Sequence, residues 1–237
     1  KMSKMKVIIA GGTSGIGLAT AALLANNGAE VIITGRNPEK MEQALAALPA
    51  AVKGQLADAA DAEVLKTCMA AVGQIDHLVL ALSGAKGGGL FRDLDLAQLR
   101  AGFEEKFFPQ LQALQAALPY MTANGSVTFI TAISARAKAP GVSGLGAING
   151  ALELMVPVLA KELKPLRVNA VSPGVIDTPW WGFLPEEARR ETFSQYAQAA
   201  PAGRVGKPED IAQAIVQLIC NTFVTGQVLT VDGGLGL

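Results

Sequence analysis

The residues with the clearest chemical purpose form a glycine-rich run, GGTSGIG, at positions 11–17. The run follows a short apolar segment and precedes a helical pattern. Glycine tolerates positive φ and lets the backbone approach a pyrophosphate closely, while a helix N-terminus offers N–H donors and the positive end of a dipole. This context predicts a dinucleotide phosphate site, with a tight structural turn as the alternative.

A second group of residues follows the next apolar segment, where the sequence reads TGRN at positions 34–37. A cofactor with a free ribose diol prefers an acidic residue near this point, and the sequence has none there. Arg36 instead offers a planar fork of donors that suits a phosphate. We therefore expect NADP(H) rather than NAD(H), with Arg36 and Asn37 among the binding residues. The alternative is that Arg36 is a solvated surface charge.

Metal and nucleic-acid chemistry find little support. The chain has two cysteines, Cys68 and Cys220, and one histidine, His77, which are too few for a disulfide framework or a four-ligand zinc site. Twenty basic residues balance twenty acidic residues, so the basic patch typical of nucleic-acid binders is absent from the composition. We expect no metal and no nucleic-acid partner.

The elements that must position these residues alternate along the chain. Short β-branched runs at 7–10, 31–34, 78–82, 127–131, 168–171 and 228–231, with a weaker one at 53–56, read as buried strands. Helical patterns lie between them at 16–26, 38–48, 61–72, 96–121, 146–163 and 208–220. This alternation predicts an α/β fold with a doubly wound, Rossmann-type parallel sheet, formed by residues 1–237 as a single domain.

Two details qualify these expectations. Pro109 and Pro157 fall inside helical patterns, where proline usually kinks a helix. The sequence shows no signal-peptide pattern, and we find no apolar run of the roughly 20 residues that a membrane span needs. We expect a cytoplasmic protein without a membrane partner.

Taken together, these motifs resemble the short-chain dehydrogenase/reductase family over essentially the whole chain. AGGTSGIG resembles its cofactor loop, LADAAD its adenine-contacting segment, RVNAVSPGVIDTP the segment after its sixth strand, and GRVGKPEDIA with TGQVLTVDGG its C-terminal pattern. The resemblance implies a seven-stranded parallel sheet and hydride transfer between NAD(P)H and a carbonyl or alcohol. It also assigns cofactor contacts to Gly11, Thr13, Ser14, Gly15, Ile16, Gly17, Asp58, Ala81, Asn149, Pro173, Gly174, Ile176 and Thr178. From the residues alone, Asp58 has an equally good role as a cap of the following segment.

The resemblance breaks down at the positions of the family's catalytic residues. Without gaps, Ala132 stands at its Ser, Leu145 at its Tyr and Asn149 at its Lys, and counting back from LPYM places Lys106 at its Asn. Leu80 and Ala81 replace its paired Asn residues. Because leucine has no proton to give, we expect weak or undetectable turnover of an ordinary ketone.

Some proton chemistry remains available. The family carries Asn on one of these helices and Lys on the next, whereas this chain carries Lys106 on the first and Asn149 on the second. The Lys106 ammonium group could therefore reach the space left by the missing catalytic side chains, where it would stabilise an oxyanion or hold a ribose. Its alternative is to extend to solvent or to a subunit interface. Ser134 is the nearest hydroxyl candidate, although loop hydrogen bonding is the commoner role. We take Lys106, Ser134 and Asn149 as candidate catalytic residues.

These expectations define a function. We expect an NADP(H)-dependent oxidoreductase with non-standard proton transfer, acting on a small carbonyl, enone or imine. Trp180, Trp181 and Phe183 favour an apolar substrate, if they line the pocket rather than the core or a subunit contact. The alternative is a weak or inactive NADP(H)-binding regulatory or structural subunit. The resemblance also implies a homotetramer or homodimer, assembled through the helices at 96–121 and 146–163.

Overall fold

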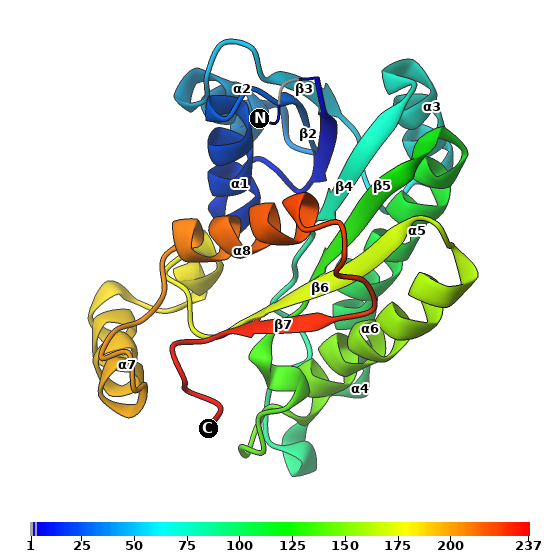
Figure 1. Cartoon of the computed structure of the whole chain (residues 1–237). Helices are drawn as coiled ribbons and strands as arrows, with labels where there is room; N and C mark the ends of the chain where they lie inside the picture. The colour runs from blue at the N-terminus through cyan, green and yellow to red at the C-terminus, as the bar shows by residue number, and fades with distance from the viewer. Residues whose placement is uncertain (1, 3) are drawn as a thin grey trace.

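A seven-stranded parallel sheet forms the centre of the computed structural model, which describes residue 2 and residues 4–237 (Figure 1). The strand order is β3-β2-β1-β4-β5-β6-β7, and every neighbouring pair is parallel. The strands are β1 (Lys6–Ala10), β2 (Glu30–Gly35), β3 (Lys53–Leu56), β4 (Ile75–Leu80), β5 (Met121–Ile130), β6 (Arg167–Pro173) and β7 (Val228–Val231). The predicted doubly wound fold is confirmed.

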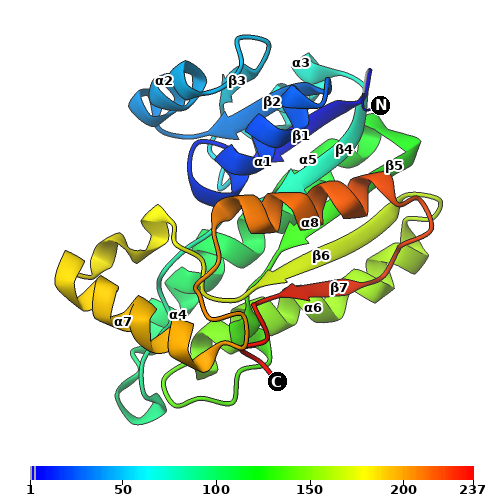
Figure 2. The ribbon, with the colours of Figure 1, turned by 60° about the vertical axis from the view of Figure 1, so that its left-hand side comes forward.

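Helices cover both faces of the sheet, as Figures 1 and 2 show. They are α1 (Gly15–Asn26), α2 (Pro38–Ala47), α3 (Ala62–Val72), α4 (Leu96–Gly102), α5 (Phe108–Ala117), α6 (Ser143–Glu162), α7 (Glu186–Ala199) and α8 (Pro208–Cys220). Val7 and Ile9 of β1 pack with α1, α2 and α8, while Ile8 and Ala10 pack with α3, α5 and α6. The period of two along each strand thus supplies two separate cores.

Short polar signals set where the helices begin. The Asn37 side chain accepts a hydrogen bond from Lys40 N (2.9 Å), with Pro38 at the first helical position of α2. Asp61 caps α3 in the same way, accepting from the backbone of Glu63 and Val64. Each cap satisfies a backbone donor that the helix itself cannot pair.

The structure does not form one continuous helix over the predicted range 96–121. This stretch folds into α4, the π-helical turn η2 (Phe103–Phe107), α5 and the short turn η3 (Leu118–Tyr120), and β5 already begins at Met121. Phe108 N donates to Phe103 O, a bond that spans five residues. This wider turn precedes Pro109, which has no N–H for a regular helical bond and whose ring would crowd the carbonyl four residues earlier. The expected kink is therefore a local π turn.

Two further expectations need correction. Pro157 does not interrupt α6, which runs unbroken from Ser143 to Glu162. By length and composition alone, α6 is also the one helix among the described residues that is long and apolar enough to cross a membrane. The statement that no apolar segment reaches this length is thus wrong for α6. Its buried residues Ile148, Leu152 and Val156 give a structural reason for that composition, since this face packs in the core.

Candidate active site

A large cleft opens at the carboxyl ends of the strands. Its volume is about 1650 Å³, and it runs from the turn after β1, past the ends of β4 and β5, to the segment after β6. β1 and β4 are neighbours at the point where the strand order reverses, which is where doubly wound sheets bind ligands. The volume exceeds that of a typical small-molecule pocket and is large enough for a dinucleotide together with a substrate.

The glycine-rich turn forms one wall of this cleft. Gly11 (φ +83°) and Gly15 (φ +53°) adopt a conformation that side chains disfavour, and a Cβ on Gly11 would lie only 2.7 Å from Ala81 O. Ser14, the N-cap of α1, makes no side-chain capping bond with any described residue, and the first turn of α1 has no acidic residue. The first N–H groups of α1 are therefore available to an anion in the cleft.

The adenosine end of the cleft carries positive charge. Arg36, Asn37 and Lys40 line it after β2, and all three side chains are exposed. Lys40 was missed by sequence reasoning, although its place on the first turn after Arg36 and Asn37 is a usable signal. Asp58 also lines the cleft, where its Oδ1 accepts from Ala60 N (3.0 Å). This bond closes a short turn before Asp61, the residue that caps α3, and the position of Asp58 in the cleft is compatible with adenine binding.

Every other residue proposed for the cofactor also lines this cleft. They are Gly11, Thr13, Ser14, Gly15, Ile16, Gly17, Ala81, Asn149, Pro173, Gly174, Ile176 and Thr178. Thr178 additionally begins the short turn η5 (Pro179–Phe183), since its Oγ1 accepts from Trp180 N (3.3 Å). The sequence positions far apart in the chain therefore meet in one place.

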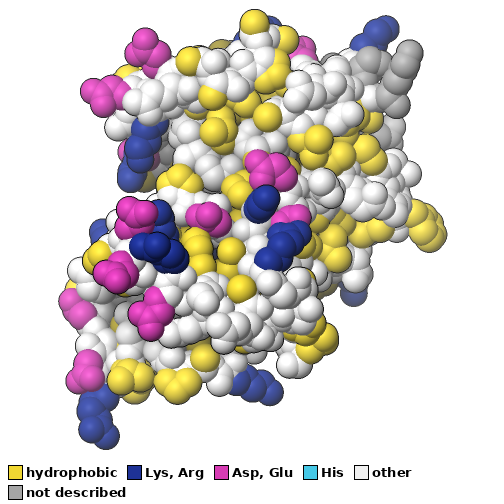
Figure 3. Space-filling view, turned by 90° about the vertical axis from the view of Figure 1, so that its left-hand side faces the viewer, with side chains coloured by type: hydrophobic (Ala, Val, Ile, Leu, Met, Phe, Trp, Pro, Cys, Tyr) yellow, Lys and Arg dark blue, Asp and Glu magenta, His cyan; other side chains and the backbone are white. Residues whose placement is uncertain are grey.

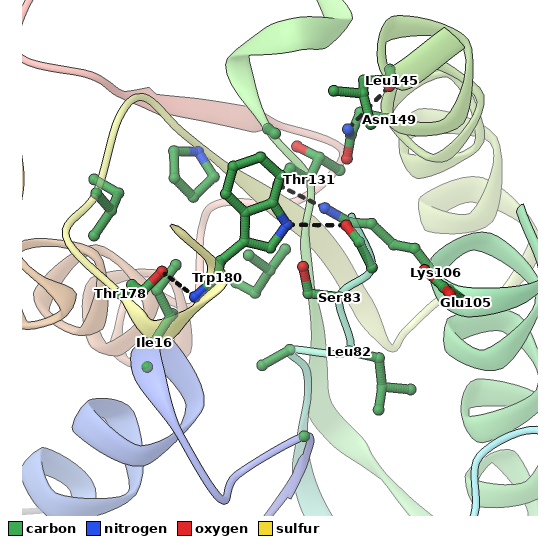
Figure 4. Close-up of a pocket in the computed structure, with 18 of the residues that line it drawn as sticks. Ile16, Leu82, Ser83, Glu105, Lys106, Thr131, Leu145, Asn149, Thr178 and Trp180 are labelled. Carbon is green, nitrogen blue, oxygen red and sulfur yellow. Dashed lines mark hydrogen bonds between the residues drawn. The ribbon is translucent and has the colours of Figure 1, made fainter. Parts of the chain in front are cut away.

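The three candidate catalytic residues all line the cleft, and two of them, Asn149 and Ser134, contact each other directly. Asn149 Nδ2 donates to Ser134 Oγ (3.0 Å) and to Leu145 O (3.0 Å), whereas its Oδ1 is buried without a partner among the described residues. Ser134 lies on the turn η4 (Ile133–Ala135), and Asn149 lies on α6 one helical turn after Leu145 (Figure 4). A buried acceptor without a donor is costly, so Asn149 Oδ1 is suited to a donor from a bound ligand.

Lys106 does not extend to solvent. It projects from the π turn η2 toward the cleft, is only 8% exposed, and donates from Nζ to Thr131 O at 3.1 Å (Figure 4). Burial lowers the pKa of Lys106 to about 8, and the nearby carboxylate of Glu153 acts in the opposite direction. An amine in this state can hold a proton and release it near neutral pH.

Glu153 is a second residue that sequence reasoning missed. It is buried on α6, four residues after Asn149 and therefore on the same face, which is the signal that was available. Its Oε1 accepts from Thr131 Oγ1 at 2.8 Å. Glu153 does not line the cleft itself but lies behind the wall that does.

Aromatic side chains close one end of the cleft. Trp180 and Trp181 line it, and their rings pack edge to face with centroids 4.8 Å apart. Trp180 Nε1 donates across the cleft to Gly84 O (3.0 Å), as Figure 4 shows. Phe183 packs against both tryptophans but is 58% exposed and lies outside the lining. The predicted apolar wall is therefore made by the tryptophans, with Tyr196 of α7 beside them.

Charge is distributed without a dominant sign. On the face shown in Figure 3, acidic and basic side chains alternate instead of forming one large patch. Among the described residues, no group of three or more His, Cys, Asp or Glu side chains is placed to hold a metal ion. The fold, the strand-order reversal and the glycine turn together define a Rossmann-type α/β protein.

Comparison with known proteins narrows this class. The sequence pattern of a family described as enoyl-(acyl carrier protein) reductase matches residues 10–236. The chain is 34% identical over 246 residues to the 3-oxoacyl-[acyl-carrier-protein] reductase of Thermotoga maritima, covering 96% of each chain. It is 30% identical to carbonyl reductase family member 4 of Danio rerio, covering 100% of this chain and 99% of the relative.

Solved structures agree with the sequence relatives. A small-chain dehydrogenase crystallised in complex with NADPH superimposes with a TM-score of 0.86 at 28% identity, covering 99% of both chains. The protein belongs to the short-chain dehydrogenase/reductase family, a family of oxidoreductases.

Proposed function

We propose that the protein is an NADP(H)-dependent oxidoreductase that transfers hydride to or from a small, apolar carbonyl, enone or imine, with proton transfer by residues other than the family's usual Tyr and Lys. The observation that carries the proposal is the buried Lys106 amine beside Thr131, on the wall of a cleft that Leu145 and Ala132 also line. The sequence resemblance assigns these two residues to the positions of the family's hydroxyls. The Lys106 amine can donate or accept a proton, whereas the side chains of Leu145 and Ala132 cannot.

Three features of the cleft fit NADP(H). The uncapped N-terminus of α1 suits the pyrophosphate, Arg36 and Lys40 suit a ribose phosphate, and the unpartnered Asn149 Oδ1 suits a ribose hydroxyl donor. The related dehydrogenase crystallised with NADPH supports the same choice. When bound, the reduced cofactor supplies the hydride.

Lys106 is the proton-handling residue in this proposal. Its ammonium group lies on the substrate wall of the cleft, where it would stabilise negative charge on a reduced oxygen and donate a proton to it. The lowered pKa of about 8 brings the proton affinity of Lys106 close to neutral pH, where such a donor works best. The neighbouring Asn149 and Ser134 would orient the ribose and the substrate through their shared hydrogen bond.

The substrate class follows from the lining opposite these groups. Trp180, Trp181, Leu145 and Val142 present mainly apolar surface to the cleft. Apolar walls with a few placed polar groups favour a largely hydrophobic ligand over a sugar phosphate. Enones and imines also fit because they need less acid assistance than a simple ketone.

A turnover assay tests the proposal. NADPH oxidation is followed by absorbance with a panel of aldehydes, quinones and enones, using the wild type and Lys106→Ala. We expect turnover to fall by about 10²–10⁴-fold in Lys106→Ala while NADPH still binds. Lys138→Ala is the matched control, because Lys138 also lines the cleft but is exposed. Equal turnover in wild type and Lys106→Ala contradicts the assigned role.

The unusual wall also supports a second candidate. With Leu145 and Ala132 in the cleft, tight NADPH binding without turnover of any substrate would identify a nucleotide-binding regulatory or structural subunit. If calorimetry detects binding of neither reduced coenzyme, both candidates fail.

We also propose that the chain assembles as a homodimer or homotetramer through α5 and α6. The outer face of α6 exposes Leu154 (78%) and Val158 (51%), and Phe108 of α5 is 43% exposed. Apolar side chains on adjacent helices commonly mark a subunit contact. Light scattering on the purified protein measures the mass, and a monomer would contradict this assignment.

A further inference from the structure

A continuous line of polar groups runs from Lys106 through Thr131 on the cleft wall to Glu153 behind it, and from there to Arg136. Lys106 Nζ donates to Thr131 O (3.1 Å), and the hydroxyl of the same threonine donates to Glu153 Oε1 (2.8 Å). The other oxygen of Glu153 lies 3.3 Å from Arg136 Nε. Thr131 thus joins the amine to the carboxylate through its own backbone and side chain.

The buried carboxylate is an exception on its helix face. Glu153 is 9% exposed, and its neighbours on the inner face of α6, Leu152 and Val156, are fully buried and apolar. Burying a carboxylate is strongly unfavourable unless cations and hydrogen bonds compensate for it. Glu153 has one hydrogen-bond donor in Thr131, one cation in Arg136, and Lys106 as the second cation near it.

The charged groups around Lys106 come from three elements. α6 contributes Glu153, the segment after η4 contributes Arg136, and η2 itself contributes Glu104 and Glu105. Glu104 is exposed, and Glu105 pairs with Lys86 at 2.7 Å. Glu153 is therefore the buried carboxylate that faces the amine.

We propose that Glu153 is a positioning residue which, through Thr131, holds the Lys106 ammonium group at the cleft wall in its charged form. The effect of Glu153 on the charge of Lys106 does not depend on the proposed function; only its effect on turnover rests on the proposed function of Lys106. Burial alone lowers the pKa of Lys106, and the carboxylate of Glu153 limits that decrease. Without the negative charge, the amine loses its proton at a lower pH and stops acting as an acid near neutrality.

The variant Glu153→Gln tests this directly. Glutamine keeps the shape and an oxygen acceptor for Thr131 but removes the charge. Carbon-13 NMR of lysine-labelled protein reports the Lys106 titration through its Cε signal, which is assigned by its disappearance in Lys106→Arg. We expect the Lys106 midpoint to move down by about one pH unit or more in Glu153→Gln. The alkaline limb of the pH profile of NADPH-dependent turnover, where Lys106 loses its proton, should move down with it.

Two further variants sharpen the comparison. Glu105→Gln is the matched control, since it removes a carboxylate from the same element as Lys106 but one that already pairs with Lys86; its Lys106 midpoint should stay unchanged. Arg136→Gln removes the cation that competes for Glu153, so the Lys106 midpoint should rise. Arg136 has a half-exposed side chain, so this variant remains informative even if Glu153→Gln fails to fold.

The outcomes separate this inference from the proposed function. If the midpoint stays unchanged in both Glu153→Gln and Arg136→Gln, the positioning role is overturned even when Lys106→Ala abolishes turnover. If the midpoint shifts as expected while the wild type shows no turnover, the positioning role stands and the proposed function fails. A shift as large in Glu105→Gln as in Glu153→Gln also overturns the inference, because the effect would then be general.

Discussion

Arg36 determines the cofactor preference in our proposal, because it is the arginine at the adenosine end of the cleft. A charge-assisted hydrogen bond contributes about 1.5–3 kcal/mol, which corresponds to roughly a ten- to hundredfold preference. We expect Arg36→Ala to weaken NADPH binding by that factor and to leave NADH binding nearly unchanged. Titration calorimetry with both coenzymes measures the two constants.

A matched exposed arginine controls for lost surface charge. Arg92→Ala on the turn η1 (Phe91–Asp93) should leave both dissociation constants as they are in the wild type. The assignment of Arg36 is refuted if the ratio of the two constants is the same in the wild type and Arg36→Ala.

The candidate site residues were predictable to different extents. The glycine turn and Arg36 each follow directly after a strand end, so local sequence order alone points to them, whereas the cofactor role of Asp58 was suggested only by the family resemblance. The surroundings of Lys106 were not predictable, since Thr131 and Glu153 reach it only through the packing of β5 and α6 against η2. The sequence was consistent with a Lys106 side chain that points into the cleft or out to solvent or a subunit interface, and in the structure the side chain is buried at the cleft wall.

The π turn η2 decides where Lys106 points. One extra residue in a helical turn rotates the following side chains by about 100°, and such turns occur frequently at functional sites. Pro109 gives this turn a local cause, because a regular helix has no donor at that position. The helix kink expected from proline is thus tied to the placement of the buried amine.

A side-chain hydrogen bond joins the segment after β6 to the loop after β4, across the end of the cleft. Trp180 Nε1 donates to Gly84 O, whereas Trp181 Nε1 donates to Ile176 O within its own segment. We expect Trp180→Phe to raise KM for substrate by about 2- to 10-fold with little change in kcat, since one neutral hydrogen bond contributes about 0.5–1.5 kcal/mol. Steady-state kinetics with the best substrate of the panel provide the measurement.

Trp181→Phe is the control for this change because it removes the same donor from the same segment. Its effect on KM should be smaller, since its bond does not span the cleft. If Trp181→Phe raises KM more than Trp180→Phe does, the closing role of Trp180 is wrong.

Element boundaries show why the sequence predicted some parts better than others. The strands were found because both faces of the sheet are buried, which yields continuous apolar runs. α7 was missed because none of its residues is buried, so it has no apolar stripe of helical period. β5 was predicted too short because its first four residues are half-buried or exposed and include Thr122 and Asn124, with a register shift beside β4.

The whole molecule has its own pH-sensitive feature in the middle of the sheet. His77 of β4 is buried, and its Nδ1 lies 2.8 Å from Ser126 Oγ of β5. Burial lowers the pKa of His77 to about 4, with a further contribution from Arg167, while Asp76 opposes the shift. Arg167 is fixed nearby because its guanidinium donates to backbone carbonyls at the end of α8.

This shift makes global stability depend on pH. Above about pH 6.5, His77 is neutral in both the folded and the unfolded chain. As the pH falls from about 6.5 to about 4, only the unfolded chain takes up the proton, so the free energy of unfolding decreases by up to about 3 kcal/mol. Below about pH 4 this contribution levels off.

Urea unfolding between pH 4 and 7.5 measures this contribution. His77→Asn keeps a polar partner for Ser126 but has no titrating group, so its stability should depend less steeply on pH than that of the wild type. Parallel curves for the two proteins would show that His77 does not titrate as described.

Neither core cluster contains a residue of α7, and the helix packs Phe193 and Tyr196 against Trp181 at the cleft. Mutations in this helix therefore alter the mouth of the cleft while leaving the two hydrophobic cores intact. Substitutions in α7 can therefore change ligand specificity over evolution with little loss of folding stability. Divergence in ligand choice among close homologues is accordingly expected to concentrate in α7 and the tryptophan segment before it.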